Sequence, residues 1–246
     1  MIKKTLFLFL CAILLSSCKA ELQDADMIIN KSIEMAGGAV VKNATITFDF
    51  RDKHYKAIRQ DGSFKLERSF KDSLQTIRDV LDNNRFQRFI NGVPFEVSKA
   101  KEAAYTSSVN SVHYFSVLPY GLHDKAVNRS YLGTTKIKGQ DYYKIKITFN
   151  EAGGGEDFED VFIYWIHTET FKADYLAYSY AESHGMGLRF REAKNERFIE
   201  GIRFVDYNNY KPKHADAILE QLDTAFENDA LEWVSKIDLE DVQVKL

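Results

Sequence analysis

The chain has 246 residues, of which 45% are hydrophobic and 13% aromatic, and its formal net charge is −3. This is ample apolar material for a sizeable core. A mildly acidic chain lacks the concentrated positive charge that nucleic acids attract, which argues against a nucleic acid partner. No stretch rich in proline or in glycine and serine interrupts the chain, so one large domain is expected.

The N-terminus has the pattern of a bacterial lipoprotein signal peptide. Two lysines precede an apolar stretch over residues 6–15, which is too short to remain in a bilayer, and small residues precede Cys18. We expect removal of residues 1–17 and attachment of acyl chains such as palmitate to Cys18, followed by a tether over 18–26 and a single domain over 27–246. The alternative is an ordinary secretory signal in which the cysteine is incidental.

The first part of the domain is expected to be a helix followed by a meander of strands. A capping aspartate and the apolar spacing predict a helix over residues 27–38, which two glycines end. Alternation of apolar and polar residues then predicts strands, and Asp61-Gly62 and Asn91-Gly92 predict turns. The expected strands are residues 44–51, 64–70, 74–81 and 85–90.

A second helix interrupts the strands. Helix-forming residues predict it over residues 98–118, with Ser98 as its cap and Pro119 at its end. Residues 112–122 carry more large apolar side chains than a connection needs. We therefore expect this segment to lie against, or to plug, another part of the fold.

The remaining chain centres on a hairpin over residues 161–180, whose first strand is apolar on both faces and therefore reads as buried on both sides. A turn is expected at Asn195. The other expected elements are strands over 130–137, 143–149, 187–193 and 197–207, a helix over 215–226 and a closing strand over 239–246.

About eleven antiparallel strands are expected in all, which is too many for a flat open sheet. The predicted fold is therefore mainly β with some helices (α+β). It is a strongly curved antiparallel half barrel of about eleven strands, with helices closing its concave face.

Such a curved sheet would leave an apolar pocket under the second helix, suited to an acyl chain or another apolar ligand. The alternative is that the same side chains fill the interior and leave a solid docking module. The expected walls are Phe48, Phe50, Tyr143, Ile145, Phe162, Trp165 and Tyr178, and the expected cover is Tyr114, Phe115 and Tyr120.

Three arginines on adjacent predicted strands form a candidate head-group site. Arg189 and Arg191 are two residues apart and so share a face, and Arg203 lies on the next strand. Guanidinium groups suit phosphate and carboxylate ligands. The alternative is cross-strand pairing of these arginines with nearby glutamates on a solvated face.

No catalytic, metal or cofactor site is expected. Acidic residues at 156–160 follow three glycines but match no calcium loop, so a solvated loop is favoured. The six histidines show no zinc-ligand spacing, and the sequence has no nucleophile elbow.

Residues 163–170 resemble a hairpin motif of the lipoprotein-carrier family, which includes the periplasmic lipoprotein chaperone and its outer-membrane receptor, with His167 in place of the usual Asp. Residues 114–122 and 187–210 resemble segments of an uncharacterised group of Gram-negative envelope lipoproteins. The first resemblance implies a helix before a curved sheet whose apolar cavity binds acyl chains. The second supplies no activity.

Together these features predict an envelope lipoprotein, anchored by its N-terminal acyl chains in the outer membrane and facing the periplasm. It would bind a hydrophobic small molecule or lipid in the cavity without catalysis. The alternatives are a docking subunit with an envelope protein partner and, with the least support, a hydrolase.

Overall fold

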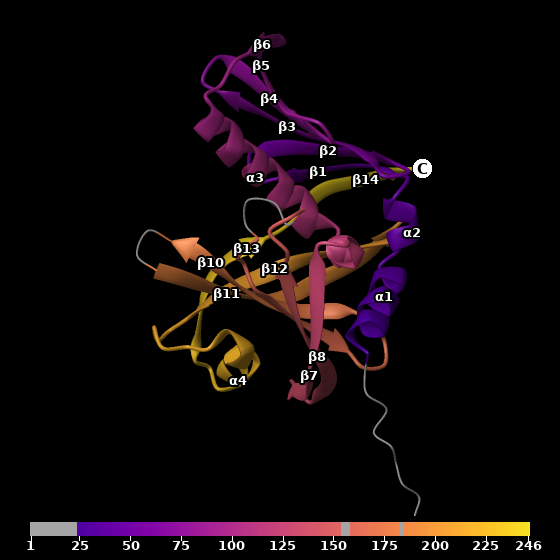
Figure 1. Ribbon diagram of the computed structural model, residues 1–246, viewed down its shortest axis with the longest axis vertical. Coiled ribbons are helices and arrows are strands. Elements are labelled where there is room, and N and C mark those ends of the chain that lie inside the picture. Colours follow the sequence, from indigo (N-terminus) through magenta and orange to yellow (C-terminus); the bar gives the residue numbers. More distant parts are fainter. Residues whose placement is uncertain (1–23, 154–157, 183–184) are drawn as a thin grey trace, which may run out of the picture.

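The computed structural model describes residues 24–153, 158–182 and 185–246 (Figure 1). Within them the protein is mainly β with some helices, as the sequence predicts. The strands form two seven-stranded antiparallel sheets. The prediction of a single strongly curved half barrel of about eleven strands is wrong, because the fourteen strands of the described residues divide between two sheets and neither sheet is closed or strongly curled.

The first sheet is a meander completed by the C-terminal end of the chain. Its order is β14-β1-β2-β3-β4-β5-β6, and β14 pairs antiparallel with β1. Strand β2 is not among the strands that the sequence predicts, because the chain reverses at Arg51 and Asp52 without a glycine. The strands are β1 Thr45–Phe50, β2 Lys53–Gln60, β3 Ser63–Asp72, β4 Gln75–Asp82, β5 Phe86–Ile90, β6 Val93–Phe95 and β14 Glu240–Lys245.

The second sheet has the order β13-β12-β11-β10-β9-β8-β7. The predicted central hairpin is confirmed as β9 and β10, in which Tyr164 lies opposite Leu176. Residues 162–166 of β9 are all buried, since both faces of this sheet are covered. The strands are β7 Val127–Ile137, β8 Gln140–Phe149, β9 Phe162–His167, β10 Ala173–Glu182, β11 Gly185–Ile199, β12 Ile202–Pro212 and β13 Leu231–Ile237.

One turn predicted for the C-terminal third is wrong, and one strand there was not predicted. Asn195 lies at a bulge within β11, and the chain turns instead at Glu200 and Gly201. Asn195 has a φ of 50°, the left-handed value that asparagine tolerates in bulges as well as in turns. The closing strand predicted over residues 239–246 is confirmed as β14, but β13 before it was not predicted. The two strands belong to different sheets, because the chain crosses between the sheets at Asp238 and Leu239.

Helices α1 and α3 occupy the positions expected for them, the last helix is shorter than predicted, and α2 was not expected. Asp24 caps α1, its side chain accepting a hydrogen bond of 2.9 Å from the backbone N–H of Asp26. None of the helices in the described residues is long and apolar enough to cross a membrane. The helices are α1 Ala25–Met35, α2 Gly38–Val41, α3 Lys99–Ser116 and α4 Leu222–Glu227, with short 3-10 turns η1 Tyr120–His123 and η2 Leu219–Gln221.

Three groups of buried side chains hold these layers together. One joins α1 to the face of the second sheet that carries Tyr164, and another joins α3 and the start of β12 to the first sheet around Phe48. The third covers the opposite face of the second sheet, where Trp165 packs near α4. Helix α3 runs along the first sheet on the side toward the second (Figure 1), and its Val109 and Phe115 belong to different groups. Helix α3 therefore bridges the two sheets.

Candidate functional site

A cavity of about 510 Å³ lies between α3 and the second sheet, reaching the end of β1. This volume falls within the range of roughly 300–1,000 Å³ typical of small-molecule sites. Apolar and aromatic side chains supply much of the lining, and the polar groups include one arginine from the sheet. Residues from six elements meet there, among them Phe50, Val112, Phe115, Tyr178, Arg191 and Tyr207.

The position of α3 determines this cavity. Val109, His113 and Ser116 are the buried residues of the helix, and their spacing places them on one stripe. The side chain of Phe115 points away from that stripe, toward the second sheet, with its ring centroid 5.7 Å from that of Tyr178 and 6.2 Å from that of Phe162. One face of α3 therefore packs on the first sheet while the other roofs the cavity.

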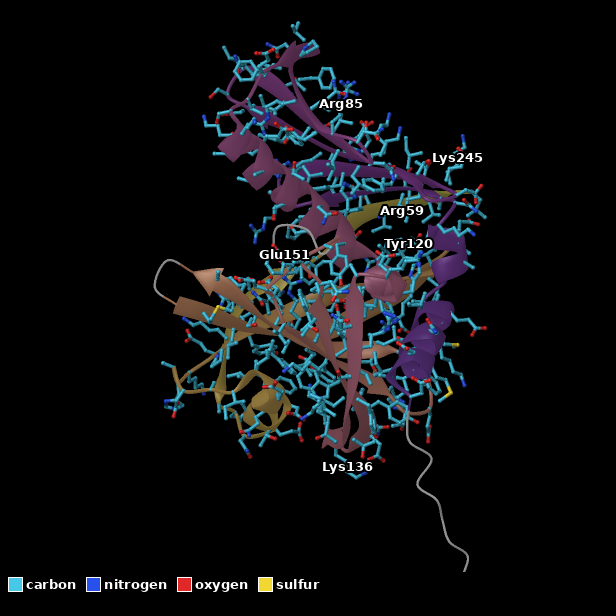
Figure 2. The ribbon with its side chains drawn as sticks, in the orientation of Figure 1. Arg59, Arg85, Tyr120, Lys136, Glu151 and Lys245 are labelled. Atoms are coloured by element: carbon cyan, nitrogen blue, oxygen red, sulfur yellow. The ribbon has the colours of Figure 1, made fainter. Side chains whose placement is uncertain are left out.

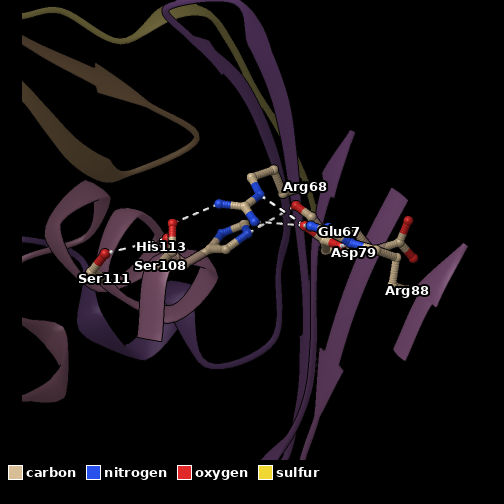
Figure 3. Close-up of polar contacts among 7 residues, drawn as sticks. All are labelled: Glu67, Arg68, Asp79, Arg88, Ser108, Ser111 and His113. Carbon is tan, nitrogen blue, oxygen red and sulfur yellow. Dashed lines mark hydrogen bonds and ion pairs between the residues drawn. The ribbon is translucent and has the colours of Figure 1, made fainter. Parts of the chain in front are cut away.

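A buried polar network fixes α3 to the first sheet (Figure 3). His113 Nε2 donates to the Glu67 carbonyl over 3.0 Å, and Arg68 Nη1 donates to Ser108 Oγ over 2.7 Å. The carboxylate of Asp79 is fully buried and accepts from Arg68 and from Arg88, each at 2.6 Å. Because the hydrogen bonds from His113 to Glu67 and from Arg68 to Ser108 form only when the helix lies on the sheet, they hold the roof of the cavity in place. The Asp79 carboxylate, within the sheet, holds Arg68 in position for its bond to the helix.

Arg191 is the buried charge on the cavity wall. Its Cζ atom lies 4.0 Å from the centroid of the Phe115 ring and 5.0 Å from that of Tyr178. Its Nη2 donates to the hydroxyl of Tyr178 over 2.8 Å. Within the described residues, no carboxylate forms an ion pair with it.

Of the predicted ligand-binding residues, the structure brings Phe50, Phe115, Tyr178 and Arg191 together on the cavity. Phe162 lies directly behind them, its ring stacked on Tyr178 at 5.3 Å. These residues come from β1, α3, β9, β10 and β11. Helix α3, which was predicted over residues 98–118, therefore does lie over a sheet as the sequence indicates. The cover, however, rests between two sheets instead of over one concave face.

The other predicted aromatic residues lie outside this cavity. Phe48 is fully buried and stacks on Tyr55 at 5.2 Å. Tyr143 packs against Tyr131 and Phe171. Trp165 is on the opposite face of the second sheet, because residues 162 and 165 point to opposite sides of a strand.

Tyr114 and Tyr120 belong to the junction that follows the cavity roof. The hydroxyl of Tyr114 is buried, and burial raises its pKa well above the ordinary value. Tyr120 lies beside Arg59 of the first sheet, whose Cζ is 5.9 Å from the tyrosine ring centroid (Figure 2). Burial lowers the pKa of Arg59, and its buried Nη1 has no hydrogen-bond partner, but the residue is not on the cavity wall.

The three predicted arginines do not form one cluster. Arg203 is paired with Asp174 at 2.9 Å and with Glu196 at 2.5 Å, as in the cross-strand alternative. Arg189 lies on the same face as Arg191, with its Cζ 5.0 Å from the ring of Tyr180. Arg191 alone of the three is on the cavity lining.

Sequence reasoning missed the contribution of β12 and β13. Val205, Tyr207 and Asn209 alternate along β12 and all line the cavity, together with Ser235 and Ile237 of β13. The alternation in β12 was the available signal, but the strand predicted over residues 197–207 ends before Asn209, and no strand was predicted at β13.

Some predicted features lie outside the described residues: the signal peptide, Cys18, part of the acidic loop at 154–157 and His184. In the part that the structure does describe, no three histidine, cysteine or acidic side chains converge as metal ligands would.

No curated protein matches this chain. Among solved structures, a LolA superfamily protein from Nitrosomonas europaea is similar with a TM-score of 0.50 and 13% identity, over 90% of this chain and 94% of that one. A putative outer membrane lipoprotein-sorting protein domain from Vibrio parahaemolyticus gives a TM-score of 0.42 and 9% identity over 88% and 93% of the two chains.

A protein of the DUF1329 family from Desulfovibrio piger gives a TM-score of 0.42 and 8% identity, over 90% and 93% of the two chains. The predicted likeness to the lipoprotein-carrier fold is thus confirmed at the level of the fold by the Nitrosomonas protein. The family model of DUF6503, a family of unknown function, matches residues 3–239, and the chain therefore belongs to that family.

Proposed function

We propose that this protein binds a hydrophobic or lipidated ligand in the cavity beneath α3 and catalyses no reaction. The observation that carries the proposal is the cavity itself, about 510 Å³ between a helix and a sheet that contribute Phe115, Tyr178 and Tyr207. Burying apolar ligand surface against such walls contributes about 25 cal/mol per Å². The carrier-like fold supports the same role, since the Nitrosomonas protein is described as a member of the LolA superfamily.

We also propose that the protein works in the cell envelope, held by acyl chains on Cys18 in the outer membrane and facing the periplasm. The lysines, apolar stretch and small residues before Cys18 support this location. Anchoring at the N-terminus would leave the cavity free, because none of the residues from 24 to 49, where the described part of the chain begins, lines it.

The test is native mass spectrometry of the soluble chain that starts at residue 19, mixed with fatty acids and phospholipids. A variant that blocks the cavity, Val112→Trp, should lose the bound mass, because the indole would occupy the space beside Phe115. Ala104→Trp is the matched control, since Ala104 is exposed on the same helix. Ser111→Trp is a second blocking variant, in case the first one does not fold.

Absence of any lipid adduct on the wild-type protein would overturn the proposal. Binding that survives in both blocking variants would overturn the assignment to this cavity. The unfolding temperature of each variant shows whether lost binding reflects lost structure.

Protein docking is a second candidate, favoured by an apolar surface on the edge of the second sheet. Trp233 on β13 is 53% exposed, and its neighbour Val234 is also exposed. An edge strand can pair with a further strand from a partner. If wild-type protein binds no lipid, crosslinking from position 234 in intact envelopes would test this role, and Trp233→Ser should abolish the crosslinked product.

A further inference from the structure

The buried guanidinium of Arg191 on the cavity wall indicates the chemistry of the ligand's head group. Arg191 is only 8% exposed, and its guanidinium lies against the rings of Phe115, Tyr178 and Tyr207. Cation–π contacts of this kind orient a guanidinium but satisfy none of its N–H groups. The group is therefore held in a fixed position with most of its donors unused.

One of those donors is buried without an acceptor. The Nε atom of Arg191 has no hydrogen-bond partner, and the only hydrogen bond that the guanidinium makes to described residues is the one from Nη2 to Tyr178. Two other arginines of similar burial, Arg68 and Arg203, each contact a carboxylate. A buried charge without a counter-ion is costly. Arg191 lies on the cavity wall, so an anionic acceptor in the cavity would remove that cost.

A second unpaired polar atom lies directly across from it. Asn209 on β12 is opposite Arg191 on β11 in the strand register. Its Nδ2 donates to Ser235 Oγ over 3.3 Å, whereas its buried Oδ1 has no partner. Because a serine hydroxyl both donates and accepts, rotation of the amide would keep the contact with Ser235 and turn Nδ2 toward the cavity as a further donor.

We propose that the cavity ligand is a single-chain amphiphile with a carboxylate head, a fatty acid, whose head group accepts hydrogen bonds from Arg191 and Asn209. This inference rests on the proposed function and names the ligand class. The cavity of about 510 Å³ suits one drug-sized ligand rather than a lipid with several chains. The chain would then run along Phe115 and Val112.

A carboxylate fits this site better than a phosphate. The buried guanidinium of Arg191 matches a single negative charge, whereas a phosphate monoester carries about −1.5 to −2. Arg51 also lines the cavity, but it is exposed, so water screens its charge. Glu159 and Asp160 also line the cavity and would oppose additional negative charge. Glu159 is exposed, so water screens its charge, and its effect on the head group is weaker than that of the buried Arg191.

The experiment titrates the soluble chain that starts at residue 19 with oleate, oleyl alcohol and oleyl phosphate. Oleate should bind at least about tenfold more tightly than oleyl alcohol, since charge-assisted hydrogen bonds are the stronger ones. Arg191→Gln should lower oleate affinity about 10- to 100-fold and leave oleyl alcohol affinity unchanged. Arg85→Gln is the matched control, because Arg85 is exposed at the far end of the first sheet (Figure 2).

The outcomes separate this inference from the proposed function. If neither oleate nor oleyl alcohol binds, the proposed function fails. If the two bind equally to the wild-type protein, or if Arg191→Gln weakens both alike, the cavity binds apolar chains but the head-group assignment is wrong. Tighter binding of oleyl phosphate than of oleate would overturn the choice of carboxylate. The wild-type comparison needs no variant, so the test stands even if Arg191→Gln does not fold.

Discussion

The imidazole of His113 on α3 reaches across to β3, where its Nε2 donates to the carbonyl of Glu67 over 3.0 Å. The ring lies edge-on to Phe48 and Tyr55, and its Nδ1 is buried without a partner. A carbonyl only accepts hydrogen bonds, so the proton of the neutral ring sits on Nε2. This contact joins the cavity roof to the first sheet through a titratable group.

The first prediction concerns stability at acidic pH. Burial, with a further contribution from Arg59 and Arg68, lowers the pKa of His113 from 6.5 to about 3. Between these values the unfolded chain binds a proton that the folded protein does not. The contribution of His113 to the free energy of unfolding should therefore be complete above pH 6.5. It should fall on acidification toward pH 3, by up to about 1.4 kcal/mol per pH unit.

Urea denaturation between pH 3 and pH 7 measures this slope. His113→Gln keeps a donor for the Glu67 carbonyl but removes the titration, so its stability should depend less on pH than that of the wild type. His214→Gln, at an exposed histidine, should behave like the wild type. Identical pH profiles for His113→Gln and the wild type would refute this assignment.

The second prediction concerns the buried carboxylate of Asp79. Asp79→Ala would leave Arg68 and Arg88 without their shared counter-ion, and breaking such a buried pair typically costs about 3–5 kcal/mol. Asp52→Ala is the control, because Asp52 pairs with Lys53 at the surface, where water screens the ion pair and its contribution to stability is small. Chemical denaturation compares the two, and equal losses would show that the Asp79 network contributes little.

Local sequence patterns predicted much of the fold. Asp24 as a helix cap, the hairpin predicted over residues 161–180 and the helix ending near Pro119 all follow from nearby residues, and all are present. The division into two sheets was not predictable in this way, because it depends on pairing between Ile46 and Val244, near opposite ends of the chain. Non-local pairings of this kind leave little trace in the local periodicity.

The candidate site was predicted in part for the same reason. Phe115, Tyr178 and Arg191 stood out because large aromatic and arginine side chains were concentrated in short segments. Asn209 was missed, since a single amide in a strand carries no signal until the facing residue is known. Trp165 was assigned to the same pocket wall as Phe162, although strand alternation separates the two.

The third prediction concerns Gly37, which joins α1 to α2. Its φ is +79°, and a Cβ atom there would lie 2.1 Å from the Gly201 carbonyl oxygen and 3.0 Å from Ile202 Cα. The neighbouring Ala36 carbonyl accepts a hydrogen bond of 3.1 Å from the Arg203 backbone N–H, so this backbone is close against β12. The position therefore demands both the left-handed conformation and the absence of a side chain.

Gly37→Ala should lower the free energy of unfolding by about 1–3 kcal/mol more than Gly62→Ala. Gly62 has a similar φ of +89° but nothing within 4 Å of the added Cβ, so it isolates the conformational cost from the clash. Thermal and urea unfolding of the two variants measure the difference. Equal losses would mean that β12 yields to the added methyl group.

The last prediction concerns attachment to the membrane. If Cys18 is the acylated residue, the protein expressed in a Gram-negative host should incorporate labelled palmitate and sediment with membranes, because more than one acyl chain makes the attachment stable. Cys18→Ser should lose the label and leave the membrane fraction. Cys11→Ser is the matched control, since Cys11 lies in the apolar stretch that would be removed. Retained label in Cys18→Ser, or a mature N-terminus at another residue, would show that the chain carries an ordinary secretory signal.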